Sequence, residues 1–227
     1  MTQTDTQARS QSAAKAEILA RIRLALGDVP DASAEQDVPV AWDYGRATRH
    51  EGVLDVFIDR VIDYKAALVR CPASEVPARV VEGLTANGVT SVVLPAGLDS
   101  AWREAIEGAG ITVHGDDPRL SRAELDAIGG VVTACAVGSA ETGTIMLDHG
   151  PDQGRRALSL VPDVHVCVIR ADQVVSDVPE AVARTADAVR AGQPSTWISG
   201  GSATSDIELS RVEGVHGPRT LHVVLAE

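Results

Sequence analysis

Short apolar runs alternate with amphipathic segments along most of this chain, and that alternation constrains the fold more than any other feature. Residues 91–95, 130–137 and 164–169 read as strands rich in β-branched residues, whereas 74–87 and 178–190 carry apolar residues at helical spacing. Strands that are apolar on both faces are typical of parallel sheets covered by helices on both sides. The sequence therefore predicts an α/β fold with a mostly parallel or mixed sheet flanked by helices.

The remaining elements follow the same pattern. We expect further strands over 66–70, 111–113, 143–147, 195–199 and 221–225, and further helices over 53–62, 100–107 and 121–127, the last with Ser121 as its N-cap. Between residues 130 and 170 several predicted strands follow one another without a helix. We therefore expect an antiparallel or mixed part of the sheet there.

The first fifty residues differ from the rest. Residues 12–26 predict an amphipathic helix that ends at Gly27, and residues 28–50 are polar, rich in turn formers and without a clear period. We therefore divide the chain into an N-terminal helical arm with a linker, 1–50, and an α/β domain, 51–227. The helix docks on its own domain or on a partner subunit, and the sequence favours the first.

Charge and cysteine content exclude several classes of function. The formal net charge is −12, which argues against a general surface for nucleic acids or anionic membranes. Cys71, Cys135 and Cys167 lie far apart without metal-ligand spacing, so we expect no metal or iron–sulfur cofactor in this chain. No apolar run approaches ~18 residues, so no membrane insertion is expected. Apparently buried thiols suit a reducing cytoplasm, and we expect a cytoplasmic location.

The first of two glycine-rich segments, residues 138–144, separates two apolar strands. Glu141 there is costly to bury unless it is hydrogen-bonded or functional, so it is a candidate base or carboxylate nucleophile. Thr142, Gly143 and Thr144 are the candidate ligand-binding residues beside it. The alternative is a polar turn in which Glu141 is solvated and Gly143 serves backbone geometry.

The second glycine-rich segment, residues 199–208, follows another apolar strand. Ser205 and Glu208 fit a capping box, so the glycines lie just before a predicted helix start and are a plausible cradle for a small anion. The candidate ligand-binding residues are Gly200, Gly201, Ser202, Thr204 and Asp206. The same pattern is also explained as a simple strand–turn–helix join. We expect the two glycine segments to be rims of one cleft at an end of the sheet.

Other polar residues are weaker candidates. His216, in the turn before the last strand, is a candidate ligand or general acid, or else it makes one structural hydrogen bond. Arg155 and Arg156 are suited to receiving an anion, although adjacent arginines more often form a solvated face. His165 and His222 lie within strand patterns, and we assign them no chemistry.

Taken together, these motifs resemble the LUD-domain family. The resemblance rests on residues 140–144, 159–165, 205–208 and 214–218, whose order and spacing are specific as a set. One departure concerns the second segment, where the family usually has a proline and an arginine. This chain has Gly201 and Ala203 at those positions, which puts a carried-over anion site in doubt.

The resemblance implies a fold similar to the NagB/RpiA/CoA-transferase-like group. It also implies a role in oxidising L-lactate to pyruvate, as a subunit or accessory factor beside two partner proteins that carry iron–sulfur clusters. By analogy with the CoA transferases alone, Glu141 followed by Thr142 and Gly143 looks like their acyl-accepting glutamate. A stand-alone enzyme that uses Glu141 on a CoA ester, a sugar phosphate or another anion is therefore the alternative. A third reading treats both segments as turns and the first helix as an oligomerisation arm.

Overall fold

The structure is a computed structural model that describes residues 3–29, 48, 50–204, 212–213 and 217–227. It divides into two compact units, residues 1–44 and 45–227, and each is described by itself. The first unit contains α1 (Gln3–Ala25). This helix begins earlier than the sequence pattern predicts, because the preceding residues are polar and carry no apolar period that would reveal a helix.

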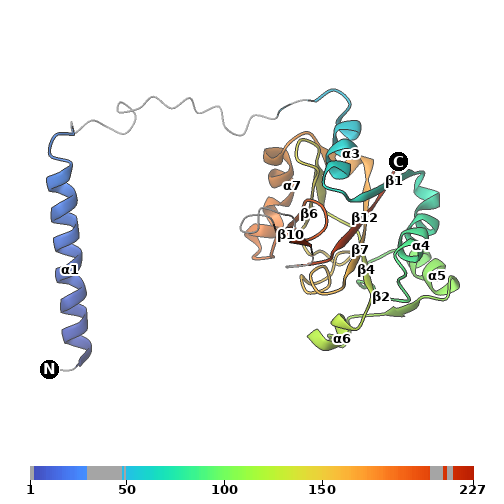
Figure 1. Cartoon of the computed structure of the whole chain (residues 1–227), viewed down its shortest axis with the longest axis horizontal. Helices are drawn as coiled ribbons and strands as arrows, with labels where there is room; N and C mark the ends of the chain where they lie inside the picture. The colour runs from blue at the N-terminus through green and yellow to red at the C-terminus, as the bar shows by residue number, and fades with distance from the viewer. Residues whose placement is uncertain (1–2, 30–47, 49, 205–211, 214–216) are drawn as a thin grey trace. The chain divides into compact units, whose positions relative to one another are not determined.

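Six strands of the second unit form a sheet in which every neighbouring pair is parallel (Figure 1). In spatial order they are β1 (Ala67–Cys71), β12 (Thr220–Ala226), β7 (Val164–Arg170), β4 (Gly130–Thr133), β2 (Ser91–Val93) and β3 (Thr112–His114). All of β4 and nearly all of β7 are buried. Burial on both faces explains their continuous apolar sequences. The predicted α/β fold with a mostly parallel sheet is confirmed.

Helices cover both faces of this sheet. One face packs on α4 (Val76–Ala86) and α5 (Ser100–Gly108), which share a core cluster with β2 and β7. The other face packs on α3 (Val53–Asp63), whose Phe57 and Val61 are buried in a second cluster. The remaining helices are the short 3-10 turns η1 (Ala73–Glu75) and η2 (Ala171–Gln173), with α6 (Arg122–Asp126) and α7 (Val178–Arg190). Ser121 caps α6 in a full capping box, as its sequence predicts.

A second sheet has four strands and mixed directions. In spatial order they are β8 (Val174–Val175), β5 (Val137–Ser139), β6 (Thr144–Leu147) and β9 (Thr196–Ile198). The β5–β6 and β6–β9 pairs are antiparallel and β5–β8 is parallel, so the expected mixed part exists as a separate sheet. The predicted single strand over 130–137 is wrong. Residues 134–136 carry the chain from β4 to β5, and Cys135 in their middle is buried in the core.

Two short strands, β10 (Ala203–Thr204) and β11 (Val212–Glu213), pair antiparallel after the second glycine segment. The capping box predicted at Ser205 and Glu208 lies outside the described residues. No helix in the described part of the chain has the length and apolar character needed to cross a membrane.

Candidate ligand-binding site

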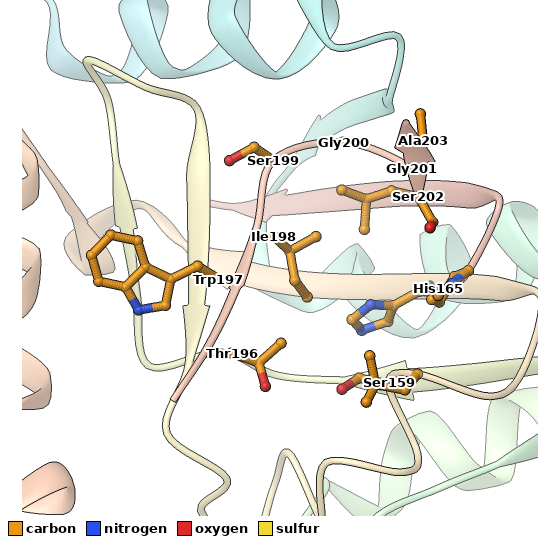
Figure 2. A pocket seen from close by; sticks show the side chains of 14 residues that line it. Ser159, His165, Thr196, Trp197, Ile198, Ser199, Gly200, Gly201, Ser202 and Ala203 are labelled. Atoms are coloured by element: carbon orange, nitrogen blue, oxygen red, sulfur yellow. The ribbon is translucent and has the colours of Figure 1, made fainter. Parts of the chain in front are cut away.

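A pocket of about 240 Å³ opens where β7 and β12 begin, at the amino edge of the six-stranded sheet (Figure 2). We call it the amino-edge pocket. The residues that line it are Ser159, Leu160, His165, Thr196, Trp197, Ile198, Ser199, Gly200, Gly201, Ser202, Ala203, Gly217, Pro218 and Leu221. Three of the sequence-predicted site residues, Gly200, Gly201 and Ser202, are therefore on its wall.

The second glycine segment is held tightly against the body of the domain. A side chain at Gly201 would place its Cβ 2.2 Å from the carbonyl oxygen of Arg219, and one at Gly200, where φ is 85°, would lie 2.7 Å from Tyr64. The Ser202 amide donates to the carbonyl of Pro218 at 2.8 Å. Glycine is thus required here because backbone approaches backbone, which also forms one wall of the pocket.

His165 enters the pocket from β7, and its side chain is only 1% exposed. Figure 2 shows its ring projecting into the space that the glycine segment encloses. Its Nε2 lies 2.8 Å from Oγ1 of Thr133, which donates onward to Sγ of Cys167 at 3.8 Å. Sequence reasoning assigned His165 no chemistry. A buried histidine inside an otherwise apolar strand was the available signal, because burying an imidazole requires hydrogen-bond partners.

Two further buried hydroxyls line the pocket. Thr196 Oγ1 lies 2.8 Å from Nε2 of His149, whose Nδ1 lies 2.8 Å from the carbonyl oxygen of Gly154. Ser159 Oγ donates to the carbonyl of Arg156 at 3.3 Å and is 2% exposed. Neither hydroxyl was predicted as a site residue, since single serines and threonines beside strands carry no distinctive pattern.

The described lining includes no charged side chain. The neighbouring Arg219 is paired with Asp163 through two hydrogen bonds of 2.6 and 2.7 Å. These hydrogen bonds hold the pKa of Asp163 below its usual range. The pair fastens the start of β12 to the residue before β7, and it occupies the arginine. The described wall therefore offers neutral donors and acceptors only.

The first glycine segment lies beside the second but does not line the same pocket. Thr142 Oγ1 donates to Thr144 Oγ1 at 2.8 Å, and Thr144 is joined to Ser199 at 2.8 Å. Glu141 is exposed and lines a separate hollow of about 400 Å³ with Thr142, beside α3. The expectation that the two glycine segments form the rims of one shared cleft is therefore wrong. Gly143, with φ of 60°, folds the β5–β6 turn closely against Arg60 and Val61 of α3.

The other predicted residues fall in different places. Thr204 lies in β10, while Asp206 and His216 lie outside the described residues. Arg155 pairs with Asp116 through two hydrogen bonds of 2.6 and 2.9 Å and also donates to the Leu120 carbonyl. Its guanidinium lowers the pKa of the Asp116 carboxyl. In this structure Arg155 therefore ties two segments together instead of facing a pocket.

A second cavity, of about 280 Å³, lies at the carboxyl edge of the same sheet. We call it the carboxyl-edge cavity. It is lined by residues that follow β2, β4 and β7, among them Asp99, Trp102 and Arg170. Asp99 caps α5 by accepting from the Ala101 amide, and Arg170 pairs with Asp172. No group of three or more His, Cys, Asp or Glu side chains is arranged to hold a metal ion within the described ranges.

Comparison with known proteins defines the family. The LUD domain model matches residues 116–226. A lactate utilization protein C of Deinococcus radiodurans is 48% identical, spanning 95% of this chain and 97% of that protein. One from Geobacillus kaustophilus is 30% identical over 58% of each. The crystal structure of a DUF162 family protein from Deinococcus radiodurans matches with a TM-score of 0.66 at 43% identity, covering 77% of this chain and 96% of that one. The chain belongs to the LUD-domain family, and the resemblance seen in its motifs is confirmed.

Proposed function

We propose that this protein takes part in lactate utilisation, as a subunit or accessory factor of a system that oxidises L-lactate to pyruvate. The observation that carries the proposal is the 48% identity to a lactate utilization protein C over nearly the full length of both chains. Because a shared fold alone does not establish function, the amino-edge pocket provides the second support. Its size and its buried polar groups suit a small polar metabolite.

In this proposal the electron transfer belongs to partner proteins that carry iron–sulfur clusters. The arrangement of the cysteines supports that division: all three are buried free thiols. Cys71 lies in a different core cluster from Cys135 and Cys167. An iron–sulfur cluster requires several cysteine thiolates around one centre. The contribution of this chain would be to bind the organic acid and to dock on the partners.

Growth on L-lactate as the carbon source tests the proposed role directly. Deletion of the gene should abolish or strongly slow growth on L-lactate as the only carbon source while leaving growth on pyruvate unchanged. Complementation with the full chain should restore growth on lactate. Normal growth of the deletion strain on L-lactate would overturn the proposal.

Association with partners is a separate measurement. A tagged full-length chain, purified gently from cells grown on lactate, should carry along proteins that contain iron and acid-labile sulfide. A tagged chain lacking residues 1–44 is the matched comparison, because those residues form a compact unit of their own. Loss of the partners only in the shortened chain would assign the contact to the N-terminal unit. Absence of iron-containing partners from both preparations would contradict the subunit role.

A further inference from the structure

Two of the three buried cysteines meet at the junction between the two sheets. Cys167 lies in the middle of β7, where its register partner on β4 is Thr133. Cys135 follows Thr133 by two residues, in the segment that carries the chain from β4 to β5. Both cysteines are at most 1% exposed and belong to the same core cluster. The Cys135 thiol hydrogen-bonds the Cys167 sulfur, so the two sulfur atoms are direct neighbours.

The backbone on each side of this contact is fixed. The Cys135 carbonyl oxygen accepts from Nε2 of Gln173 at 2.7 Å. Cys167 is paired in register with Val223 of β12 on one side and with Thr133 of β4 on the other. A disulfide forms only between thiols that the backbone brings close together and points at each other. Because each segment is held by its own hydrogen bonds, the two thiols stay in the mutual contact that disulfide formation needs.

The surroundings make the two sulfur atoms unequal. Cys167 accepts hydrogen bonds from Cys135, from the His165 ring and from the Thr133 hydroxyl, the last at 3.8 Å. The bond from Cys135 lowers the pKa of Cys167 most, and His165 and Thr133 add to this effect while burial opposes it. The same contact, together with burial, raises the pKa of Cys135. Since the thiolate is the attacking species, Cys167 is the nucleophile of the pair and Cys135 is the thiol that resolves its product.

His165 connects this pair to the amino-edge pocket. Its ring lines the pocket, as Figure 2 shows, and it also hydrogen-bonds Cys167 and lies 2.8 Å from the Thr133 hydroxyl. A small oxidant in the pocket therefore meets His165 on its way to Cys167. Cys71 has a different setting, because it lies in the core cluster under α4 and α5, where burial raises its pKa.

We propose that Cys135 and Cys167 are a redox-active pair that forms a reversible disulfide on contact with a hydroperoxide. The Cys167 thiolate attacks one oxygen of hydrogen peroxide and the O–O bond breaks. The departing hydroxide takes up the proton that Cys167 had released, which gives water and a sulfenic acid on Cys167.

The second step closes the disulfide. The Cys135 sulfur attacks the Cys167 sulfur, the S–O bond breaks, and the leaving hydroxide takes up the Cys135 proton. Two thiols and one hydrogen peroxide thus become one disulfide and two waters, so the sulfur atoms lose two electrons and the peroxide oxygens gain them. A dithiol of low reduction potential reverses the reaction by thiol–disulfide exchange.

Oxidation changes the hydrogen bonds at the floor of the amino-edge pocket. In the disulfide Cys167 carries no charge and is bonded to a second sulfur, so it becomes a weaker acceptor for His165 and Thr133. The pocket should therefore respond to oxidants, which is a regulatory property beyond the proposed function. The thiol pair is a property of the fold alone, and its test does not depend on growth on L-lactate.

Thiol counting on the purified full-length chain tests the pair. After reduction and removal of the reductant, an equimolar amount of hydrogen peroxide should lower the free thiols from three to one, and dithiothreitol should restore them. The intact mass should fall by two hydrogen atoms, and proteolytic fragments should be joined through Cys135 and Cys167. Both thiols should disappear at least about tenfold faster than Cys71 is modified. A chain in which both stay free, or in which Cys167 reaches sulfinic acid without a disulfide, would overturn the proposal.

Single replacements assign the two roles. In Cys135→Ser the sulfenic acid of Cys167 should persist and be trapped by dimedone, whereas Cys167→Ser should leave Cys135 unreacted. Cys71→Ser is the matched control and should form the disulfide as the wild type does. Alanine variants repeat the test where a serine lowers the melting temperature, because a buried hydroxyl needs a hydrogen-bond partner. Dimedone labelling of Cys135 in Cys167→Ser would contradict the assignment of Cys167 as the nucleophile.

The link to the pocket has a readout of its own. Nitrogen NMR shifts of the His165 ring should move when the wild type is oxidised and return after reduction. The ring of His222, which packs against Gly83 of α4, is the internal control and should not move. Unchanged His165 shifts beside a mapped disulfide would show that the pocket does not sense the oxidation.

Discussion

The two ends of the six-stranded sheet carry cavities of similar volume and opposite character. At the carboxyl edge, about 280 Å³ is lined by charged side chains, and the positive one, Arg170, pairs with Asp172. At the amino edge, about 240 Å³ has no charged side chain on its described wall, and its buried histidine, His165, contacts the Thr133 hydroxyl. The general rule places ligands of open α/β sheets at the carboxyl ends of the strands. Here the second glycine-rich segment lines the cavity at the other end.

The comparison teaches that a cavity is a weaker indicator of a site than the hydrogen-bonding state of the atoms around it. The carboxylate of Asp99, which lines the carboxyl-edge cavity, is already used to cap α5. An anion there would compete with that carboxylate for the same helix end. In the amino-edge pocket the buried side chains of His165, Thr196 and Ser159 have internal hydrogen-bond partners, and no charged side chain lines the described wall.

The largest expected effect comes from adding a methyl group to the glycine loop at either edge. At Gly201 the new Cβ would lie 2.2 Å from the carbonyl oxygen of Arg219, and at Gly97 it would lie 2.5 Å from the backbone of Pro151. Each alanine variant should lose about 1–3 kcal/mol of unfolding free energy or more, measured by urea denaturation. Only Gly201→Ala should also weaken L-lactate binding. Gly108→Ala, where the Cβ meets no atom within 4 Å, should be neutral or stabilising.

Asp99→Ala addresses the carboxyl edge alone. It removes the side-chain cap of α5, so the unfolding free energy should fall by about 1 kcal/mol. Binding of L-lactate should not change, because Asp99 lines the carboxyl-edge cavity and is not in the lining of the amino-edge pocket. A changed affinity for L-lactate would show that the two cavities are coupled through the sheet. Asp99→Asn, which retains capping ability, is the matched control.

His222 provides a pH test on β12. Burial lowers its pKa, Glu82 opposes the shift, and its Nε2 is buried without a hydrogen-bond partner in the described structure. Since the unfolded state then binds the proton more tightly, stability should fall as pH decreases below about 6.5. Denaturation curves between pH 7 and pH 5 measure this slope. Replacement by Phe should flatten it, and an unchanged slope would assign the effect to another group.

The smallest effect is expected for Glu141→Gln. Glu141 is exposed and lines the hollow beside α3, so the unfolding free energy should change by no more than about 0.5 kcal/mol. Binding of L-lactate should be unchanged. Its role as a base or nucleophile remains a prediction: turnover of a CoA ester or sugar phosphate that disappears in this variant would support it. Loss of L-lactate binding would instead show that the two glycine segments form one functional unit.

Sequence reasoning succeeded where a local pattern has one physical meaning. Apolar runs such as 164–169 are buried on both faces, which requires a covered parallel sheet, and Ser121 with Glu124 makes the predicted helix cap. Gly200 and Gly201 line a pocket wall, where glycine permits close backbone approach, and their role in binding a ligand stays a prediction. The run over 130–137 misled, since its residues are equally apolar in either sheet.

The amino-acid sequence by itself therefore determined the class of fold, the order of its strands and helices along the chain, and the family. These depend on periodicity and on motifs that each span a few residues. Only the tertiary structure decided that Thr133, Cys167 and His165 form one hydrogen-bonded relay, and that His149 orients Thr196 from 47 residues away. The hydrogen-bond partner of each of these buried side chains lies far away in the sequence. Local pattern carries no information about those contacts, and for this reason the composition of the pocket wall became visible only in three dimensions.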